Sequence, residues 1–190
     1  FAYLNELFIK RHQKILWKSS EKITVGALAV LAVGIFAVLF FPETKEGINK
    51  ILLNALPYFV FVMYLINRGV GFTRALFVNC DHSLLTYPFY KSPSNILRLF
   101  RIRLWEIMKI NLLPASVIGV GLAFLLFLSG GTDNPINYVL IFVTITALSI
   151  FFSVHYLTLY YLTQPYNAGT EIKSGTYQLV IWLTYMICYI

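Results

Sequence analysis

Three adjacent residues, Cys80, Asp81 and His82, have the side-chain types from which metal sites and catalytic sites are built, and Ser83 follows them. Neighbouring side chains of a helix point in different directions, so these three cannot converge on one ion, and no second cluster of ligands occurs. Nothing elsewhere suggests the nucleophile turn or oxyanion hole of a serine hydrolase. We therefore expect no metal site, no cofactor and no catalytic residue in this chain, which predicts that it is not an enzyme.

Six polar residues recur along the apolar stretch 136–163 at alternating intervals of three and four. This spacing places all six on one face of a helix. Polar side chains avoid lipid, so we expect the face to look into the protein. We interpret it as a hydrogen-bonded seam between helices, with the wall of a substrate path or a dimer interface as the alternative. The six residues are Thr146, Ser149, Ser153, Tyr156, Tyr160 and Thr163.

Small residues recur every four positions in the stretch 111–128, as Ala115, Gly119 and Ala123. Small side chains on one helix face allow another helix to approach closely. We expect this face to pack against a helix of the same domain, and dimerisation of two subunits is the alternative.

The elements that carry these residues are those of a membrane protein. The chain is 58% hydrophobic and 12% charged, whereas a soluble domain has about 25% charged residues. The predicted fold is an all-α, polytopic transmembrane helical bundle with about five visible spans, together with interfacial and cytoplasmic coupling helices. The predicted spans are 23–41, 48–67 with a bend at Pro57, 111–128, 136–163, and a fifth that starts near Thr176.

Residues 1–190 are expected to form one transmembrane domain. The chain starts at Phe1 and its last apolar run, from Tyr177, is shorter than the about 20 residues that a span requires. We interpret the chain as part of a longer permease.

Two polar segments flank the spans. Residues 1–22 mix apolar and basic side chains at helical spacing, which predicts an interfacial helix. In the interval 68–110, Asp81 or Ser83 is expected to begin a short helix that Pro88 ends. Ser92 or Ser94 is expected to begin the next helix, with Pro93 in its first turn.

This next helix, over residues 94–110, is predicted to enter the span 111–128 without a break. Arg103 and Glu106 are spaced to form an ion pair. The helix either rests at the lipid interface, with its arginines on anionic headgroups, or transmits motion from a cytosolic partner. Its expected apolar side is formed by Leu97, Phe100, Leu104, Ile107 and Met108.

The basic residues predict the orientation of the bundle. Residues 1–22 carry five lysines and arginines, the interval 68–110 carries seven, and the loop 164–175 carries Lys173. The two turns on the other side carry only Lys45 and Lys50. Because positive loops stay in the cytoplasm, we expect a multi-pass plasma-membrane protein with a cytoplasmic N-terminus. This topology accounts for the net charge of +7 without nucleic acid as a partner.

The interval also carries a resemblance. An acidic Asp81, the pair Leu84-Leu85, the element Tyr87-Pro88-Phe89-Tyr90 and then Ile96-Leu97-Arg98 resemble the cytoplasmic loop of bacterial type-2 ABC exporter permeases, the putative ABC exporter family. The order of interfacial helix, two spans, loop and further spans is similar as well.

The resemblance implies a permease subunit that couples ATP hydrolysis in a separate cytosolic ATP-binding cassette subunit to substrate export. Because this chain has no Walker A pattern, ATP and magnesium would be bound by that partner. A second permease copy or half, and membrane lipid, are the other implied partners. The residues implied in docking on the ATPase are Asp81, Ser83, Leu84, Leu85, Tyr87, Pro88, Phe89 and Tyr90.

Two other classes of function remain open. A secondary transporter or channel subunit requires ionisable residues in the membrane and discontinuous helices. His155 lies beside the polar face, but no Asp or Glu lies within a predicted span to complete a proton relay. A lipid-modifying membrane enzyme has Asp81-His82 as its one candidate pair.

Overall fold

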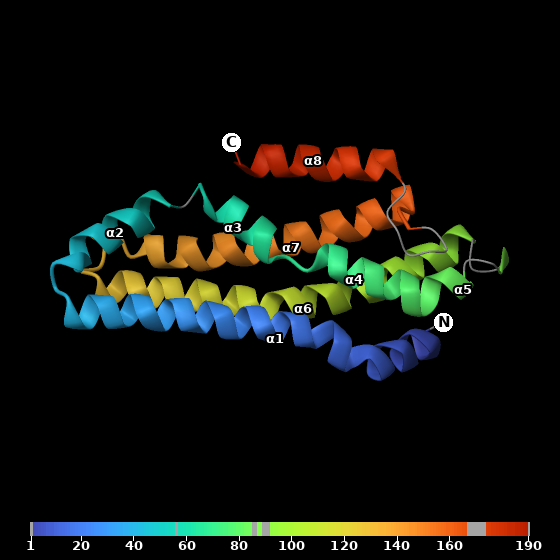
Figure 1. Ribbon diagram of the computed structural model, residues 1–190, viewed down its shortest axis with the longest axis horizontal. Coiled ribbons are helices and arrows are strands. Elements are labelled where there is room, and N and C mark those ends of the chain that lie inside the picture. Colours follow the sequence, from blue (N-terminus) through green and yellow to red (C-terminus); the bar gives the residue numbers. More distant parts are fainter. Residues whose placement is uncertain (1, 56, 85–86, 89–91, 167–173, 190) are drawn as a thin grey trace.

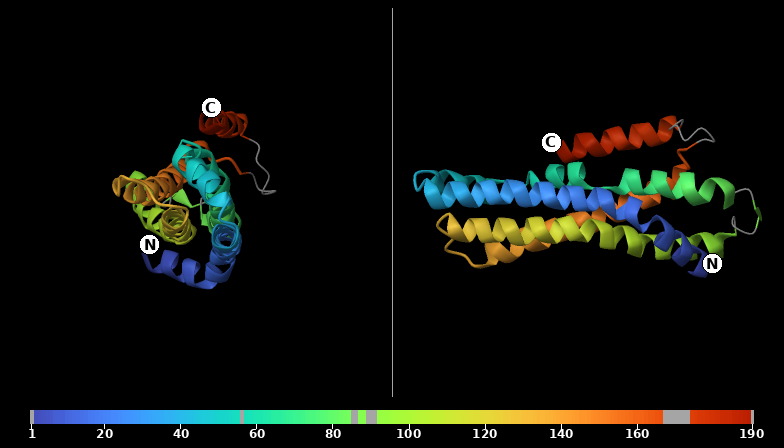
Figure 2. Two further views of the ribbon diagram at one scale, coloured as in Figure 1. Left: turned by 90° about the vertical axis from the view of Figure 1, so that its left-hand side faces the viewer. Right: turned by 60° about the horizontal axis from the view of Figure 1, so that its bottom comes forward.

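Helices account for all the regular structure that the chain shows in its described part. The computed structural model describes residues 2–55, 57–84, 87–88, 92–166 and 174–189. Helices α1, α6 and α7 lie side by side as long rods, and the shorter helices lie along them (Figures 1 and 2). The helices are α1 (Ala2–Phe40), α2 (Thr44–Asn54), α3 (Phe59–Ile66), α4 (Gly69–Leu76), the π-helix η1 (Phe77–Asp81), α5 (His82–Leu84), α6 (Pro93–Leu128), α7 (Ile136–Thr163) and α8 (Gly175–Tyr189).

Among the described residues, three helices are long and apolar enough to cross a membrane. They are Glu6–Phe40 of α1, all of α6 and all of α7. A helix with the bounds of the predicted span 136–163 is confirmed, and α6 confirms that the helix before residue 111 continues through residues 111–128. Helix α8 begins close to the predicted fifth span, but its 15 described residues are fewer than the about 20 that a span requires.

The predicted second span is broken. Helices α2 and α3 are separated by a short interval that contains Pro57, and the chain turns there by 82°. Proline lacks the amide proton that a helix requires, which explains why the break falls there. The bent pair starts beside the end of α1 and reaches the opposite end of the bundle through α4 and η1 (Figure 1), so it traverses the bundle as a fourth, discontinuous segment.

Residues 2–22 of the predicted interfacial helix continue into the first predicted span within one helix. Helix α1 is continuous from Ala2 to Phe40, although its ribbon changes direction in the amino-terminal half (Figure 1). No proline or glycine precedes Gly26, so nothing in the backbone stops the helix where its side chains change from basic to apolar.

Glycines allow α6 to lie close to both of its long neighbours. A Cβ added at Gly119 would lie 3.0 Å from the ring of Phe142 on α7, and one added at Gly121 would overlap Leu31 on α1. Ala115 is fully buried on the same side of α6 as Gly119, whereas Ala123 is half-buried. The small residues Ala115, Gly119 and Ala123 therefore lie on a helix that packs closely on α1 and α7.

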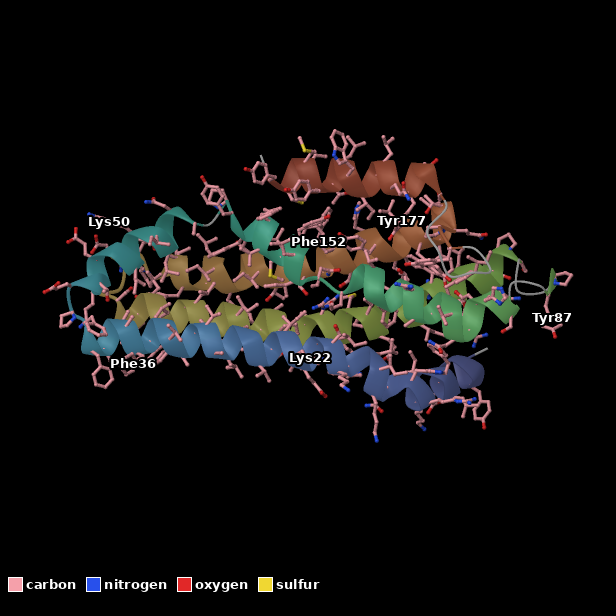
Figure 3. The ribbon with its side chains drawn as sticks, viewed as in Figure 1. Lys22, Phe36, Lys50, Tyr87, Phe152 and Tyr177 are labelled. Atoms are coloured by element: carbon pink, nitrogen blue, oxygen red, sulfur yellow. The ribbon has the colours of Figure 1, made fainter. Side chains whose placement is uncertain are left out.

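The bundle is longer than a membrane is thick. Helix α6 has 36 residues, or about 54 Å at 1.5 Å per residue, while the hydrocarbon core of a bilayer is about 30 Å. Lys22 lies about halfway along the long axis, Lys50 lies near one end and Tyr87 lies at the other (Figure 3). The half beyond Lys22, which ends at Tyr87 and is called the basic end, contains α4, η1, α5 and the first half of α6.

Candidate functional site

A buried ion pair joins three elements at the basic end. Arg103 of α6 donates from Nη1 to Asp81 Oδ2 at 2.6 Å and from Nη2 to Asp81 Oδ1 at 2.5 Å, a bidentate arrangement. Arg103 is 1% exposed and Asp81, the last residue of η1, is 5% exposed. A pair so far from water is stable only while both charges are present.

Two tyrosines of α7 complete this cluster. The Tyr160 hydroxyl donates to Asp81 Oδ2 at 2.5 Å, and Arg103 Nη1 also donates to the Tyr161 hydroxyl at 2.7 Å. The guanidinium carbon lies 5.9 Å from the centre of the Tyr161 ring, which adds a cation–π contact. Asp81, Arg103, Tyr160 and Tyr161, named the ion-pair cluster here, therefore tie η1, α6 and α7 together.

The local fold explains how Asp81 reaches this position. Helix α4 continues into the π-helix η1, whose wider turn shifts the direction of the side chains that follow. Leu76, Ile107 and Leu157 are fully buried in the same apolar cluster as Tyr160 and exclude water from the surroundings of the pair. Single π-turns inside helices are often found at functional sites.

A second polar contact layer lies about two turns further along α6. Asn111 Nδ2 donates to Ser153 Oγ of α7 at 2.9 Å, and Asn111 Oδ1 accepts from the backbone amide of Arg68 at 3.3 Å. The Ser20 hydroxyl of α1 donates to the Ile110 carbonyl at 2.6 Å. The two layers hold α1, the start of α4, α6 and α7 in register along the basic half of the bundle.

The end of α7 is also anchored on α4. The Tyr166 hydroxyl donates to the Val70 carbonyl and lies 3.3 Å from the Thr73 hydroxyl. Burial raises the pKa of Tyr166 above its ordinary value, which favours the protonated phenol that donates this bond. Gly69 permits the close approach of α4 and α7, because a Cβ at this position would overlap the ring of Tyr156.

The polar face of α7 looks into the protein. Ser149, Ser153, Tyr156 and Tyr160 are buried, and Thr146 and Thr163 are half-buried. Ser153 and Tyr160 make hydrogen bonds to α6 and η1, which supports the interpretation as a seam between helices. The hydroxyls of Thr146 and Ser149 have no partner among the described residues.

The residues implied in docking divide into a buried and an exposed group. Asp81 is enclosed in the ion-pair cluster, so in this conformation its carboxylate holds the loop and does not reach a partner subunit. Tyr87 is 55% exposed, Pro88 is exposed, and Tyr87 projects from the tip of the basic end (Figure 3). Ser83 donates to the Cys80 carbonyl and is exposed. Leu84 ends α5, and Leu85, Phe89 and Tyr90 lie outside the described residues.

Two expectations about this segment are wrong. No helix begins at Asp81 or Ser83, because α5 continues directly from η1. Arg103 does not pair with Glu106, whose carboxylate instead accepts from Lys109 at 2.8 Å. By contrast, the start of the next helix is confirmed, with Ser92 at the N-cap position and Pro93 as the first helical residue.

The predicted apolar side of residues 94–110 is also wrong in part. Leu97 is 68% exposed, whereas Leu99, Arg103 and Ile107 form the buried face. These three residues are spaced by four, so the sequence contained the signal that Arg103 shares a face with apolar side chains. A charged residue on such a face requires a partner, and Asp81 is one of only two acidic residues in the interval 68–110.

Cys80, Asp81 and His82 are not arranged as metal ligands. No group of three His, Cys, Asp or Glu side chains that could hold a metal ion occurs in the described part of the chain. Both carboxylate oxygens of Asp81 already accept hydrogen bonds from Arg103. The His82 ring instead packs edge-on against Phe77.

His155 does not take part in the ion-pair cluster. It lies about one and a half turns before Tyr160 on α7, and its Nε2 is 3.0 Å from the Thr184 hydroxyl of α8.

Comparison of the chain with protein-family models, with curated proteins and with solved structures gives no significant match.

Proposed function

We propose that this chain is the membrane-spanning permease subunit of an ATP-driven exporter of the ABC type. In this proposal a separate cytosolic ATP-binding cassette subunit binds ATP and magnesium and docks at the tip around Tyr87 and Pro88. The N-terminus and the basic end face the cytoplasm, and the host membrane is the plasma membrane. The chain itself performs no chemistry.

The observation that carries the proposal is the ion-pair cluster between the exposed tip and the long helices. Asp81 lies six residues before Tyr87 and is held by Arg103 of α6 and Tyr160 of α7. Helix α6 runs without interruption from Pro93 to Leu128. A displacement of the tip would therefore move α6 and α7 as rigid levers within the bilayer, which is how a partner's conformational change is transmitted over a distance.

A secondary transporter or channel subunit is the second candidate, and two observations favour it. The segment from Thr44 to Asp81 is broken by an 82° turn, and discontinuous helices line the paths of many transporters. The segment also ends in a buried ionised pair, which in a membrane protein commonly marks a functional position.

A photo-crosslinking experiment tests the first candidate. A benzoylphenylalanine side chain replaces Tyr87 in the full chain, and irradiated native membranes are analysed by mass spectrometry for crosslinked proteins. We expect a protein that carries a Walker A sequence and whose ATPase activity co-purifies with the chain. The matched control is the same substitution at Tyr58, which is 67% exposed and directly precedes α3.

The two candidates give different results. A crosslink from position 87, but not from 58, to a Walker A protein supports the ABC permease. If no such protein is captured and ion flux through the purified chain in proteoliposomes follows a proton gradient without ATP, the first candidate is wrong and the second is supported.

A further inference from the structure

An apolar cavity of about 390 Å³ lies between α1 and α3, with α6 and α7 as its floor. Helix α3 packs mainly on α7 and α8, which leaves space between it and α1. The walls are entirely apolar and include Gly26 and Val30 of α1, Val62 of α3, Leu122 of α6 and Ile145 of α7. This volume is within the range of about 300–1,000 Å³ of small-molecule sites.

The cavity opens to the outside of the bundle beside the apolar stretch of α1. Val30 is 74% exposed and Val62 is 40% exposed, although both line the cavity. The lining of α1 runs from Ile23 to Leu31, immediately after the basic residues end. A ligand that enters from this side comes from the hydrocarbon phase of the bilayer.

Two basic residues flank one end of the cavity in the sequence, although neither belongs to its lining. Helices α1 and α3 run in opposite directions (Figure 1), so Ile23 and Ile66 line the same end. Lys22 directly precedes Ile23, and Arg68 follows Ile66 by two residues; both side chains are exposed. Lys22 is also one helical turn before Gly26, which places it on the stripe of α1 that lines the cavity. At the other end, no basic residue adjoins Leu31 or Phe59 in the sequence.

We propose that this cavity binds one acyl chain of an anionic phospholipid, whose phosphate is held by Lys22 and Arg68. An apolar slot that opens sideways and a pair of cations at one end match the two parts of such a lipid. Lys22 lies about halfway along the bundle (Figure 3), where a headgroup would lie if the half without the basic segments spans the bilayer. The proposal does not depend on the ATPase partner.

The cavity is tested by filling it. Gly26 lines the cavity, and an added Cβ would meet nothing within 4 Å, so Gly26→Leu adds a side chain whose Cβ has open space. Gly47 on α2 also has open space and does not line the cavity, so Gly47→Leu is the matched control. Native mass spectrometry of the purified full chain, with phosphatidylglycerol and phosphatidylcholine of identical acyl chains, counts the lipids retained.

We expect wild type and Gly47→Leu to retain one phosphatidylglycerol that Gly26→Leu loses. Equal retention by Gly26→Leu would overturn the proposal. The proposal would also be overturned if Gly26→Leu changed the number of subunits but not the amount of bound lipid. The cavity would then be a contact between two chains.

The basic end is tested separately. Lys22→Gln and Arg68→Gln are each expected to reduce the preference for phosphatidylglycerol about fivefold, the effect of one basic residue at an anionic surface. Lys45→Gln, at the opposite end of the bundle, should leave the preference unchanged. An equal affinity of wild type for both lipids would refute the phosphate contact.

A crosslinking measurement at the rim of the cavity detects the bound lipid directly and does not depend on loss of binding in a variant. Benzoylphenylalanine at Val62 is placed in a bilayer of phosphatidylcholine with a minor share of phosphatidylglycerol. Its crosslinks should be enriched in phosphatidylglycerol, whereas crosslinks from Val139, which is 60% exposed and does not line the cavity, should follow the bulk composition. Bulk composition at both positions would contradict the proposal.

Discussion

Asp81 and Arg103 are coupled so closely that the loss of either one leaves the other buried without a counter-charge. We expect Arg103→Met to lower the free energy of unfolding by about 3–5 kcal/mol, the usual cost of breaking a buried pair from one side. The double variant Asp81→Leu with Arg103→Met should recover most of this loss, because no charge then remains in the apolar surroundings. Unfolding in mixed micelles, followed by circular dichroism, measures both values.

The exposed pair Glu46–Lys50 provides the control for this prediction. Its atoms are also close, with Lys50 Nζ at 2.6 Å from Glu46 Oε1, but both side chains are at least 70% exposed. Lys50→Met should therefore leave stability unchanged, since exposed ion pairs contribute little. If Arg103→Met lowered the free energy of unfolding as little as Lys50→Met, the ion-pair cluster would not hold η1, α6 and α7 together.

Gly69 and Gly71 differ in their surroundings although they are two residues apart on α4. A Cβ at Gly69 would overlap Tyr156, whereas a Cβ at Gly71 would meet nothing within 4 Å. Gly69→Ala should destabilise the protein by about 1–3 kcal/mol through overpacking. Gly71→Ala should be neutral or stabilising, because alanine favours a helix by about 1 kcal/mol. Thermal unfolding of the two variants would show equal shifts if α4 did not pack closely on α7.

Whole helices were more predictable than their contacts. The Ser92–Pro93 start and the continuity of residues 94–128 follow from local signals, and so do the bounds of α7. The break near Pro57 follows from proline chemistry, but its 82° turn depends on packing against α7 and α8. The pairing of Asp81 with Arg103 joins residues 22 apart through a π-helix, and no local pattern encodes that approach.

The continuity of α6 can be tested between the two polar layers. Glu106 and Lys109 pair with each other on the outside of the helix, so replacing both removes the same contact whether alanine or glycine is introduced. The double glycine variant should weaken the helix by about 1 kcal/mol per site relative to the double alanine variant. In the double glycine variant, amide hydrogen exchange should be faster over residues 93–105 than in the double alanine variant. Over residues 116–128 the two variants should exchange at the same rate. Equal exchange in both variants would mean that α6 does not act as one lever.

The arrangement of charge over the whole molecule agrees with the path of the chain. The start of α1, the segment from α4 to α5, the start of α6 and the end of α7 gather at the basic end, and α2 lies at the other (Figures 1 and 2). Counting basic residues could predict this grouping without any knowledge of the contacts. It could not reveal that Arg103, counted among the surface charges, is 1% exposed and neutralised inside the bundle.

Membrane topology provides the strongest test at this scale, because it depends on whether the bent segment Thr44–Asp81 crosses the bilayer. After Cys80 and Cys188 are replaced by alanine, single cysteines are introduced at Lys45 and Arg98, which are both exposed. A membrane-impermeant maleimide should label position 45 in intact cells and position 98 only after permeabilisation, since positive segments remain in the cytoplasm. The reverse pattern would invert the proposed orientation. Labelling of both positions from one side would show that the broken segment returns to the face it entered, and that the tip at Tyr87 does not share a side with the N-terminus.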